Sequence, residues 1–404
     1  MEGNNAPVIR FNGFNAAWEQ RKLGELFVES DERSSTEEIL SVSVANGIYP
    51  ASESERDTNP GASIANYKIV RVGDIVYNSM RMWQGAVGSS RYNGIVSPAY
   101  VVAKPVVELD STCFGYLLKR PEMLYKYLCN SQGNSKDTQT LRYERFAEIT
   151  AEVPSTIEEQ RAISNCLEGL DNLITLHQRK CDKLVKLKPA MLNRMFPKPG
   201  NFEPEIRFAG FKEPWERYRL GDVAAIARGE RFTASDYVES GGIPCIHYGE
   251  IYTSYGTIAT KTFSQVSSSL KDSLRYAKKG DVIVAATSEN VEDVCKAVVW
   301  MGNSPVAYHD DSFALTFSGD PIFLVSFFET SEFFAQKSSS AHGVKVMRVS
   351  SDSLADVDLP LPSAAEQRLI GGYFAKLDNL ITLHRRKIKG LKKIKSAMLD
   401  KMFV

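Results

Sequence analysis

The sequence predicts an α+β protein in which two globular α+β domains are separated by two long helices that form an antiparallel coiled coil, with a pseudo-twofold internal repeat. Three observations predict this architecture. The chain repeats itself almost from end to end. Each copy divides into a part rich in Ser, Thr and Gly and a part nearly without Gly or Pro, and the second part carries apolar residues at coiled-coil spacing.

Near-identical segments mark the two copies. IRFNGF at 9–14 returns as IRFAGF at 206–211, an offset of 197, and LDNLITLHQRK at 170–180 returns as LDNLITLHRRK at 377–387, an offset of 207. The second copy therefore has ten additional residues between these landmarks. The repeat predicts globular domains at 1–153 and 201–358, each followed by a helical spacer, at 154–200 and 359–404.

The two globular segments alternate short β-like runs with turns. VVAKPVV at 101–107 and DVIVAAT at 281–287 are rich in strand-forming residues, and Gly and Pro separate such runs. The interiors of the two segments share little sequence, although their flanks match. We therefore expect one α+β scaffold that carries two unlike surfaces.

Residues 158–196 and 365–403 are each expected to form one long helix, which begins after a proline-bearing stretch and has Glu in its first turn. At 1.5 Å per residue each helix extends about 58 Å, so the pair is expected to form a rod. Pro189 is expected to kink the first helix. The apolar seam comprises Leu167, Leu170, Ile174, His177, Leu184 and Met191 in the first helix, and Phe374, Leu377, Ile381, His384, Leu391 and Met398 in the second.

Two features of the helices have a second interpretation. His177 and His384 occupy equivalent seam positions, where packing with a hydrogen bond is favoured over a pH switch or a metal site. The basic run near the end of each helix either follows phosphates or is a solvated face.

Composition limits the classes of protein that the chain can belong to. Lys plus Arg and Asp plus Glu both number 49, so the net charge is zero and any nucleic-acid partner must be met by local patches. The six cysteines form no CxxC pair, which indicates free thiols rather than a disulfide framework or a zinc site. No apolar run approaches the roughly 20 residues of a membrane helix, and no signal-peptide pattern is present. We expect a cytoplasmic protein with no membrane partner.

The signatures of common enzymes are missing. The sequence has no GxxxxGK[ST] phosphate loop and no HExxH, GxSxG or GxGxxG motif. Ser97-Pro98-Ala99-Tyr100 lacks the Asn of the adenine methyltransferase loop that it partly matches, and Glu292-Asp293 beside Lys296 is a common surface pattern. The sequence therefore predicts no catalytic residue and no metal site.

A globular domain and a long helix, both duplicated, with divergent interiors and near-identical flanks, resemble the specificity subunit of Type I restriction-modification enzymes. The resemblance covers the whole chain. Its marks are the IRFxGF openings followed by Trp18-Glu19 and Trp215-Glu216, the Gly73-Asp74 and Gly280-Asp281 turns, the segment 95–100, and the Glu-Gln-Arg helix starts at 159–161 and 366–368.

The resemblance implies a DNA sequence-specificity subunit without catalytic activity. Each globular domain would be a target-recognition domain that reads one half of a bipartite, asymmetric double-stranded DNA target. Two modification subunits, which are adenine methyltransferases, and restriction subunits would be its partners. S-adenosylmethionine, ATP and magnesium would belong to those partners and no cofactor to this chain. Asn172, Thr175, Asn379 and Thr382, which lie off the seam, would belong to the docking surfaces on the helices.

Polar, basic and aromatic residues near predicted turns are the candidates for DNA contact, because Arg, Asn and Gln bond base edges and cations bond phosphates. In the first domain they are Asn78, Ser79, Arg81, Trp83, Gln84, Asn134, Lys136, Thr138, Arg142 and Tyr143. In the second domain they are Arg228, Arg231, Thr233, His247, Tyr248, Ser288, Asn290, His342 and Lys345. Trp83 has the alternative of a core position, and the loop from Asn134 to Thr138 that of a solvated turn.

Two rival functions remain at this stage. A tandem-repeat coiled-coil scaffold without a DNA role fits the zero net charge. A self-contained methyltransferase or nuclease is the other rival, although no motif supports it.

Overall fold

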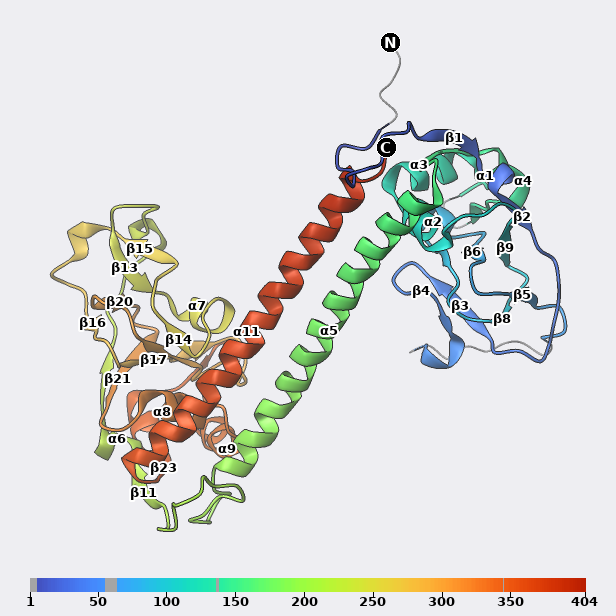
Figure 1. Cartoon of the computed structure of the whole chain (residues 1–404). Helices are drawn as coiled ribbons and strands as arrows, with labels where there is room; N and C mark the ends of the chain where they lie inside the picture. The colour runs from blue at the N-terminus through green and yellow to red at the C-terminus, as the bar shows by residue number, and fades with distance from the viewer. Residues whose placement is uncertain (1–5, 55–63, 136–137, 344) are drawn as a thin grey trace. The chain divides into compact units, whose positions relative to one another are not determined.

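The computed structural model describes residues 6–54, 64–135, 138–343 and 345–404. They form two compact units. Unit 1 comprises the described residues up to Leu176 together with Ile388–Val404, and unit 2 comprises His177–Lys387. Each unit contains one globular part with mixed helices and strands and a stretch of both long helices (Figure 1), which confirms the predicted α+β class.

Unit 1 is built on a four-stranded antiparallel sheet. Its strands follow the order β2 (Phe27–Glu29), β9 (Tyr100–Pro105), β6 (Ile75–Asn78) and β7 (Val87–Ser89). Three strand pairs add to it: β1 (Glu19–Lys22) with β10 (Thr150–Val153), β3 (Leu40–Ser43) with β4 (Gly47–Pro50), and β5 (Lys68–Val70) with β8 (Gly94–Val96). Its short helices are α1 (Leu23–Leu26), α2 (Ser111–Leu117), α3 (Pro121–Asn130) and α4 (Tyr143–Glu148).

Unit 2 repeats this plan with additions. Its main sheet follows the order β12 (Ala224–Arg228), β21 (Ser312–Phe317), β17 (Val282–Ala285), β19 (Ala297–Trp300) and β14 (Ile258–Ala259). A second sheet has the order β15 (Ser264–Val266), β13 (Ile243–Ile246), β20 (Val306–Tyr308) and β16 (Tyr276–Ala277). The pairs are β11 (Glu216–Arg219) with β23 (Asp358–Leu361) and β18 (Thr287–Ser288) with β22 (Met347–Arg348). Its short helices are α6 (Leu220–Val223), α7 (Tyr248–Thr253), α8 (Pro321–Phe327), α9 (Ser331–Ser340) and α10 (Ser351–Ala355).

The inner sheet is common to both units. Strands β2, β9, β6 and β7 correspond in order and direction to β12, β21, β17 and β19. The second sheet of unit 2 also has a smaller counterpart: β3–β4 and β5–β8 pair antiparallel as β13–β15 and β20–β16 do, and a parallel bridge between Ile39 and Ile95 joins them as β13 joins β20. Strand β14, at the edge of the main sheet of unit 2, has no match among the described strands of unit 1. Both units are therefore built on one scaffold.

The long helices are α5 (Ile157–Met195) and α11 (Ala364–Lys401), within two residues of their predicted bounds. In unit 1, Cys166 contacts Met398 and Asp171 pairs with Lys395; in unit 2, His177 contacts His384 and Lys188 pairs with Asp378. In each unit the partner number falls as the other rises, so the helices run antiparallel. Helix α5 continues through Pro189 as a single helix, and the expected kink there stays a prediction.

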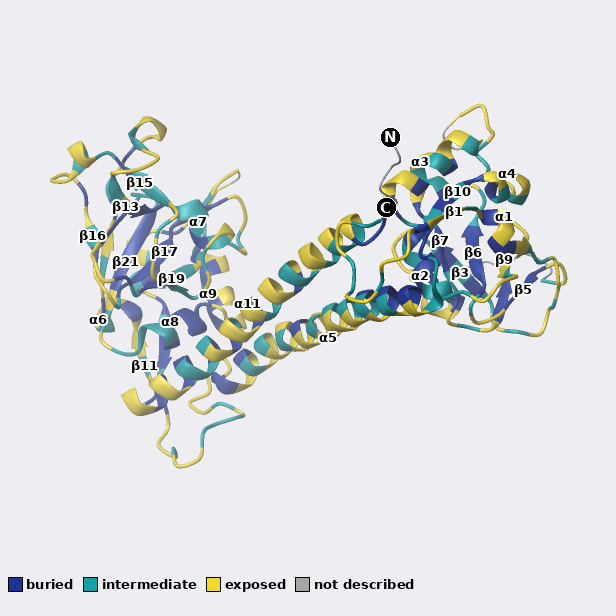
Figure 2. Cartoon of the chain, turned by 45° about the horizontal axis from the view of Figure 1, so that its top comes forward, coloured by how far each residue is buried: buried dark blue, intermediate teal, exposed yellow. Residues whose placement is uncertain are grey.

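The seam residues lie on the covered side of both helices. None of the twelve predicted seam positions is exposed, while most residues between them are, and Figure 2 shows this as a covered stripe along α5 and α11. Leu167 and Phe374 are fully buried. The 3.5-residue repeat is therefore read correctly from the sequence.

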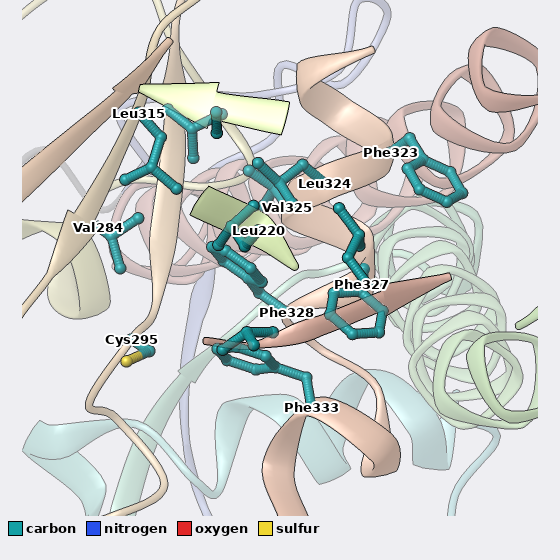
Figure 3. Close-up of a cluster of buried hydrophobic side chains, with 14 of the residues drawn as sticks. Leu220, Val284, Cys295, Leu315, Phe323, Leu324, Val325, Phe327, Phe328 and Phe333 are labelled. Carbon is teal, nitrogen blue, oxygen red and sulfur yellow. The ribbon is translucent and has the colours of Figure 1, made fainter. Parts of the chain in front are cut away.

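Each globular core includes the ends of the long helices. In unit 2, Leu192, Met195 and Phe196 of α5 and its continuation pack with Phe374 of α11 and with the aromatic cluster of α8 and α9 shown in Figure 3. In unit 1 the corresponding helix ends contribute Leu167 of α5 together with Met402 and Phe403, which follow α11. In each unit the helix ends and the adjoining globular part therefore share a hydrophobic core.

The IRFxGF repeat now has a structural reason, because in each unit it fastens one helix end to the start of the other helix. In unit 1, Ile9 N–H donates to the Lys401 carbonyl at 2.9 Å, Arg10 pairs with Glu159 at 2.6 Å, and the Trp18 ring meets Phe403 edge-on at 6.0 Å. We call this set of contacts the clamp.

Unit 2 contains the same clamp. Ile206 N–H donates to the Arg194 carbonyl at 2.8 Å, Arg207 pairs with Glu366 at 2.8 Å, and the Trp215 ring meets Phe196 edge-on at 6.0 Å. The repeated motif is thus a packing device. Within the described residues, no helix is both long enough and apolar enough to cross a bilayer.

Candidate nucleic-acid interface

The two predicted loops of unit 1 lie side by side. Leu141 N–H donates to the Ser79 carbonyl at 2.8 Å, and a bridge between Gln132 and Thr140 closes the second loop. The turn after β6 therefore meets the segment that precedes α4. Most of the unit 1 candidates are carried by these two loops.

Residues of the first loop differ in how free their side chains are. Arg81 and Gln84 are exposed, and no hydrogen bond or ion pair to another described residue engages either side chain. The Asn78 carboxamide accepts from Met80 N–H at 3.0 Å and the Ser79 hydroxyl donates to the Ala99 carbonyl at 2.8 Å, so both shape the turn. Trp83 is half-buried against the core cluster of unit 1, which supports the alternative of a packing role.

The second loop presents Asn134, Thr138 and Arg142 to solvent. The Tyr143 hydroxyl donates to the Phe27 carbonyl at 2.6 Å, and its ring packs on Phe146, so this side chain ties α4 to the sheet. Lys136 lies outside the described residues.

Unit 2 places its equivalent loops in the same way. Val349 N–H donates to the Ala286 carbonyl at 3.0 Å, as Leu141 does to Ser79, and a bridge joins His342 to Arg348. Asn290, His342 and Lys345 are exposed. Ser288 lies in the β18–β22 ladder and is 3% exposed, so its side chain is buried in this structure.

The other unit 2 candidates gather around a residue that the sequence did not single out, His309. Its ring meets Phe232 edge-on at 4.8 Å and lies 5.6 Å from the His247 ring, which is tilted by 40° against the Tyr248 ring at 4.3 Å. Arg228 donates from Nε to the Asp310 carbonyl at 2.8 Å, and Thr233 caps the turn at 234–236. Arg231, next to Phe232, is exposed with no described partner.

Both histidines of this cluster lie within hydrogen-bond distance of a backbone N–H at Nδ1. For His309 the donor is Asp311 N–H at 3.1 Å, and its Nε2 lies 3.0 Å from the Phe232 carbonyl. The carboxylates of Asp310 and Asp311 also approach His309 Nδ1, at 3.1 and 3.5 Å. His247 Nδ1 accepts from Gly249 N–H at 3.1 Å, which leaves Nε2 as a donor. Burial, and then the neighbouring His309, lower the pKa of His247. The cluster thus combines imidazole and phenol rings with arginines at its edge.

Asp311 links this cluster to the neighbouring loop. Thr287 donates from its hydroxyl to Asp311 at 2.9 Å, and Ala286 N–H donates to the Asp311 carbonyl at 2.8 Å. These hydrogen bonds join the His309 cluster to the loop that carries Ser288 and Asn290. The sequence carried no signal for His309 beyond its being one of three histidines outside the helices.

One group within the described chain has three potential metal ligands within 4.8 Å of one another: His309, Asp310 and Asp311. Both nitrogens of His309 are engaged, as described above, and the Asp311 carboxylate accepts from Thr287. These contacts make the group part of a hydrogen-bond network that holds the loop.

The fold and the two loop surfaces define a class: a tandem recognition protein, in which one scaffold is used twice with different side chains at equivalent loops. A family model described as the Type I restriction modification DNA specificity domain matches residues 15–186 and 212–393. The chain belongs to this family.

Known relatives extend the comparison. The MjaVIII specificity subunit of a Type I restriction enzyme from Methanocaldococcus jannaschii is 24% identical over 373 residues, which cover 88% of this chain and 85% of the relative. The Type I S subunit structure from M. genitalium is 15% identical with a TM-score of 0.54 and 99% coverage of both chains. A chain from a structure of the type I R-M system is 17% identical with a TM-score of 0.50, covering 97% of this chain and 99% of that one. These structural similarities concern the fold.

Proposed function

We propose that this chain is the DNA-reading subunit of a Type I restriction-modification complex, and that each unit reads one part of a bipartite, asymmetric target. The observation that carries the proposal is the repeated pair of adjacent loops. Ser79 with Leu141 in unit 1 and Ala286 with Val349 in unit 2 hold these loops in the same arrangement, while the side chains that they present differ. Two unlike reading surfaces on one scaffold suit a target with two unlike halves.

The exposed side chains have the chemistry that base and phosphate contacts need. Arg81 and Gln84 in unit 1 can bond guanine and adenine edges in bidentate fashion, and Arg231 in unit 2 can do the same or bind phosphate. His247 offers an Nε2 donor beside the Tyr248 ring. Of the two candidate arginines of unit 2, Arg228 lies 3.7 Å from the Asp310 carboxylate, so Arg231 is the one free to meet a phosphate.

Catalysis is assigned to partner subunits in this proposal. Family membership supports it: modification subunits would bind S-adenosylmethionine and methylate adenine, and restriction subunits would use ATP and magnesium. This chain would hold no cofactor and would set only where those subunits act.

The outer faces of the long helices supply two repeated docking surfaces for the modification subunits. Leu173 and Leu176 of α5 are 45% and 46% exposed, and their repeat equivalents Leu380 and Leu383 of α11 are 43% and 46% exposed. Polar residues of the same faces, Asn172 and Thr175 on α5 and Asn379 and Thr382 on α11, are exposed as well. Exposed leucine pairs repeated to this degree indicate a repeated protein partner. We therefore propose two modification subunits for each specificity chain.

Two experiments test these proposals separately. Mapping of methylated adenines in the genome, with and without this gene, should show the loss of methylation at one split motif. An unchanged methylation map in a strain that expresses the partner subunits would contradict the reading role. Light scattering of the purified complex should give two modification subunits per chain, and a one-to-one complex would contradict the docking proposal alone.

A further inference from the structure

A cavity of about 810 Å³ lies within unit 1, between the globular part and the two long helices. Its wall is formed by the β3–β4 turn, the end of β7, helix α2 with residues 119–121 beyond it, and one face each of α5 and α11. Three tyrosines line it, Tyr49, Tyr92 and Tyr116, so the wall offers both aromatic and hydroxyl groups. None of the candidate DNA-contact residues lines it, whereas Asn172 and Thr175 of the proposed docking face of α5 do.

Lys119 enters this cavity without a partner. It lies two residues after α2 and is half-buried, and among the described residues no hydrogen bond or ion pair engages its ammonium group. Its Nζ lies against the β3–β4 turn at Gly47, where a Cβ atom would stand 3.4 Å from it. Burial, and then the charge of Lys395, lower the pKa of Lys119. A half-buried ammonium beside a second ammonium is an arrangement that an anion would stabilise.

Unit 2 contains the same position, and hydrogen bonds establish the equivalence. Asp110 N–H donates to the Gln160 side-chain carbonyl at 2.8 Å in unit 1, and Asp320 N–H donates to that of Gln367 at 3.0 Å in unit 2. Both aspartates cap the following seven-residue helix, α2 or α8. Counting nine residues from each cap places Glu329 where unit 1 has Lys119. The offset is locally 210 rather than the 207 that the flanks share.

The side chains at this position have opposite charges, Lys119 in unit 1 and Glu329 in unit 2. Glu329 pairs with Lys188 at 2.5 Å, and Lys188 also pairs with Asp378 at 2.7 Å. Lys395 and Asp171 are the repeat equivalents of Lys188 and Asp378, and they pair at 2.6 Å in unit 1. The helix lysine therefore meets two carboxylates in unit 2 but one in unit 1, where a lysine replaces the second.

The acidic groups of the cavity do not supply the missing carboxylate. Asp171 is engaged by Lys395 and also accepts from the Tyr116 hydroxyl at 2.7 Å. Glu53 and Asp400 line the cavity and are exposed, and neither forms an ion pair with Lys119 within the described part of the chain. Of the remaining cations, Arg91 pairs with Glu168 and Arg120 with Glu122.

We propose that the unit 1 cavity binds a small oxyanion, a carboxylate or a phosphate, between Lys119 and Lys395, at the place that the Glu329 carboxylate fills in unit 2. Charge-assisted hydrogen bonds from two ammonium groups would hold it, as Lys188 holds Glu329. The cavity of about 810 Å³, which Tyr49, Tyr92 and Tyr116 line, can also hold a larger molecule that carries the anion. This site makes the stability of unit 1, and not that of unit 2, depend on a ligand.

Thermal unfolding of the full chain tests the proposal, with low-millimolar sodium phosphate or sodium glutamate compared with sodium chloride at equal ionic strength and pH. We expect one of the two oxyanions to raise the Tm by about 2–4 °C, with a saturable dependence on concentration. A larger effect of glutamate identifies a carboxylate site, and a larger effect of phosphate identifies a phosphate site. General salt effects are measured with Lys261→Glu, an exposed lysine with the same change of charge.

Lys119→Glu gives the sharper readout, because it installs the carboxylate that unit 2 carries. We expect this variant to have a higher Tm in chloride than Lys261→Glu and to lose the response to oxyanions, and Lys119→Met to lose the response only. Glu329→Gln should leave the response of unit 1 intact. The proposal is overturned if neither oxyanion exceeds chloride, or if the response persists in Lys119→Glu. None of these results depends on DNA binding, so they leave the reading role untouched.

Discussion

Removal of the clamp arginine is the most discriminating test of how each unit holds its helix ends. Arg207 binds Glu366 through two hydrogen bonds, at 2.8 and 2.9 Å, and the Glu366 side chain is 1% exposed. Arg207→Ala would leave a buried carboxylate without its cation. Breaking a buried ion pair from one side costs about 3–5 kcal/mol. In a unit of this size, each kcal/mol lowers the Tm by roughly 2–4 °C.

The repeat provides a matched control, because the two clamps differ at one hydrogen bond. In unit 1, Glu159 accepts from Arg10 and also from the Trp18 indole at 3.3 Å. In unit 2, the Trp215 indole nitrogen has no partner among the described residues. Arg10→Ala therefore leaves Glu159 with one donor. We expect it to cost about 1 kcal/mol less than Arg207→Ala, the net worth of one hydrogen bond.

Urea unfolding of the full chain, followed by circular dichroism, measures both variants. The double variant Arg207→Ala with Glu366→Gln should recover part of the loss, because it removes the unpaired charge. If Arg207→Ala lowers the free energy of unfolding by less than about 1 kcal/mol, the Arg207–Glu366 pair contributes no more than an exposed ion pair does. Equal losses for the two arginines would refute the role assigned to the Trp18 hydrogen bond.

Three further predictions follow from other contacts. Burial, then Lys387, His384 and Lys180, lower the pKa of His177 below 6.5. The stability that neutral His177 contributes beside His384 should therefore be complete above pH 6.5 and be lost as the pH falls from 6.5 through the lower native value. A shallower pH dependence of urea unfolding in His177→Leu/His384→Leu checks this, and an unchanged slope would contradict it. Arg231→Ala should weaken DNA binding. If Arg231 contacts a phosphate, the slope of log K against log salt should fall by about 0.9, and if it contacts a base, the sequence preference should relax. The control Arg219→Ala, at an exposed ion pair with Asp356, should change neither. Leu176→Asp or Leu383→Asp should each remove one modification subunit from the complex by light scattering, and retention of both subunits would argue against these faces.

The sequence predicted the helices better than the loops. The seam from Leu167 to Met191 fixes which face is covered, because a 3.5-residue period leaves one solution. The inner sheet was predicted only as a class, since alternation identifies strands such as β9 but not their neighbours.

The contacts of the loops could not be predicted from the sequence, for physical reasons. His309 lies in the core of the unit 2 cluster through ring packing and a carbonyl of distant Phe232, and no local pattern encodes that contact. The equivalence of Lys119 and Glu329 was hidden because the constant offset of the flanks conceals a local shift in loop length. Hydrogen bonds of the caps at Asp110 and Asp320 were needed to reveal it.

The clamp has a consequence for the order in which the protein can fold during synthesis. Unit 2 is one continuous stretch, His177–Lys387, so its core can close as soon as that stretch has left the ribosome. Unit 1 is finished by Met402 and Phe403, which pack against a core whose first residues, such as Trp18, are made several hundred residues earlier. The first unit to be translated is therefore the last to be completed, and until then its open end must be kept from other chains.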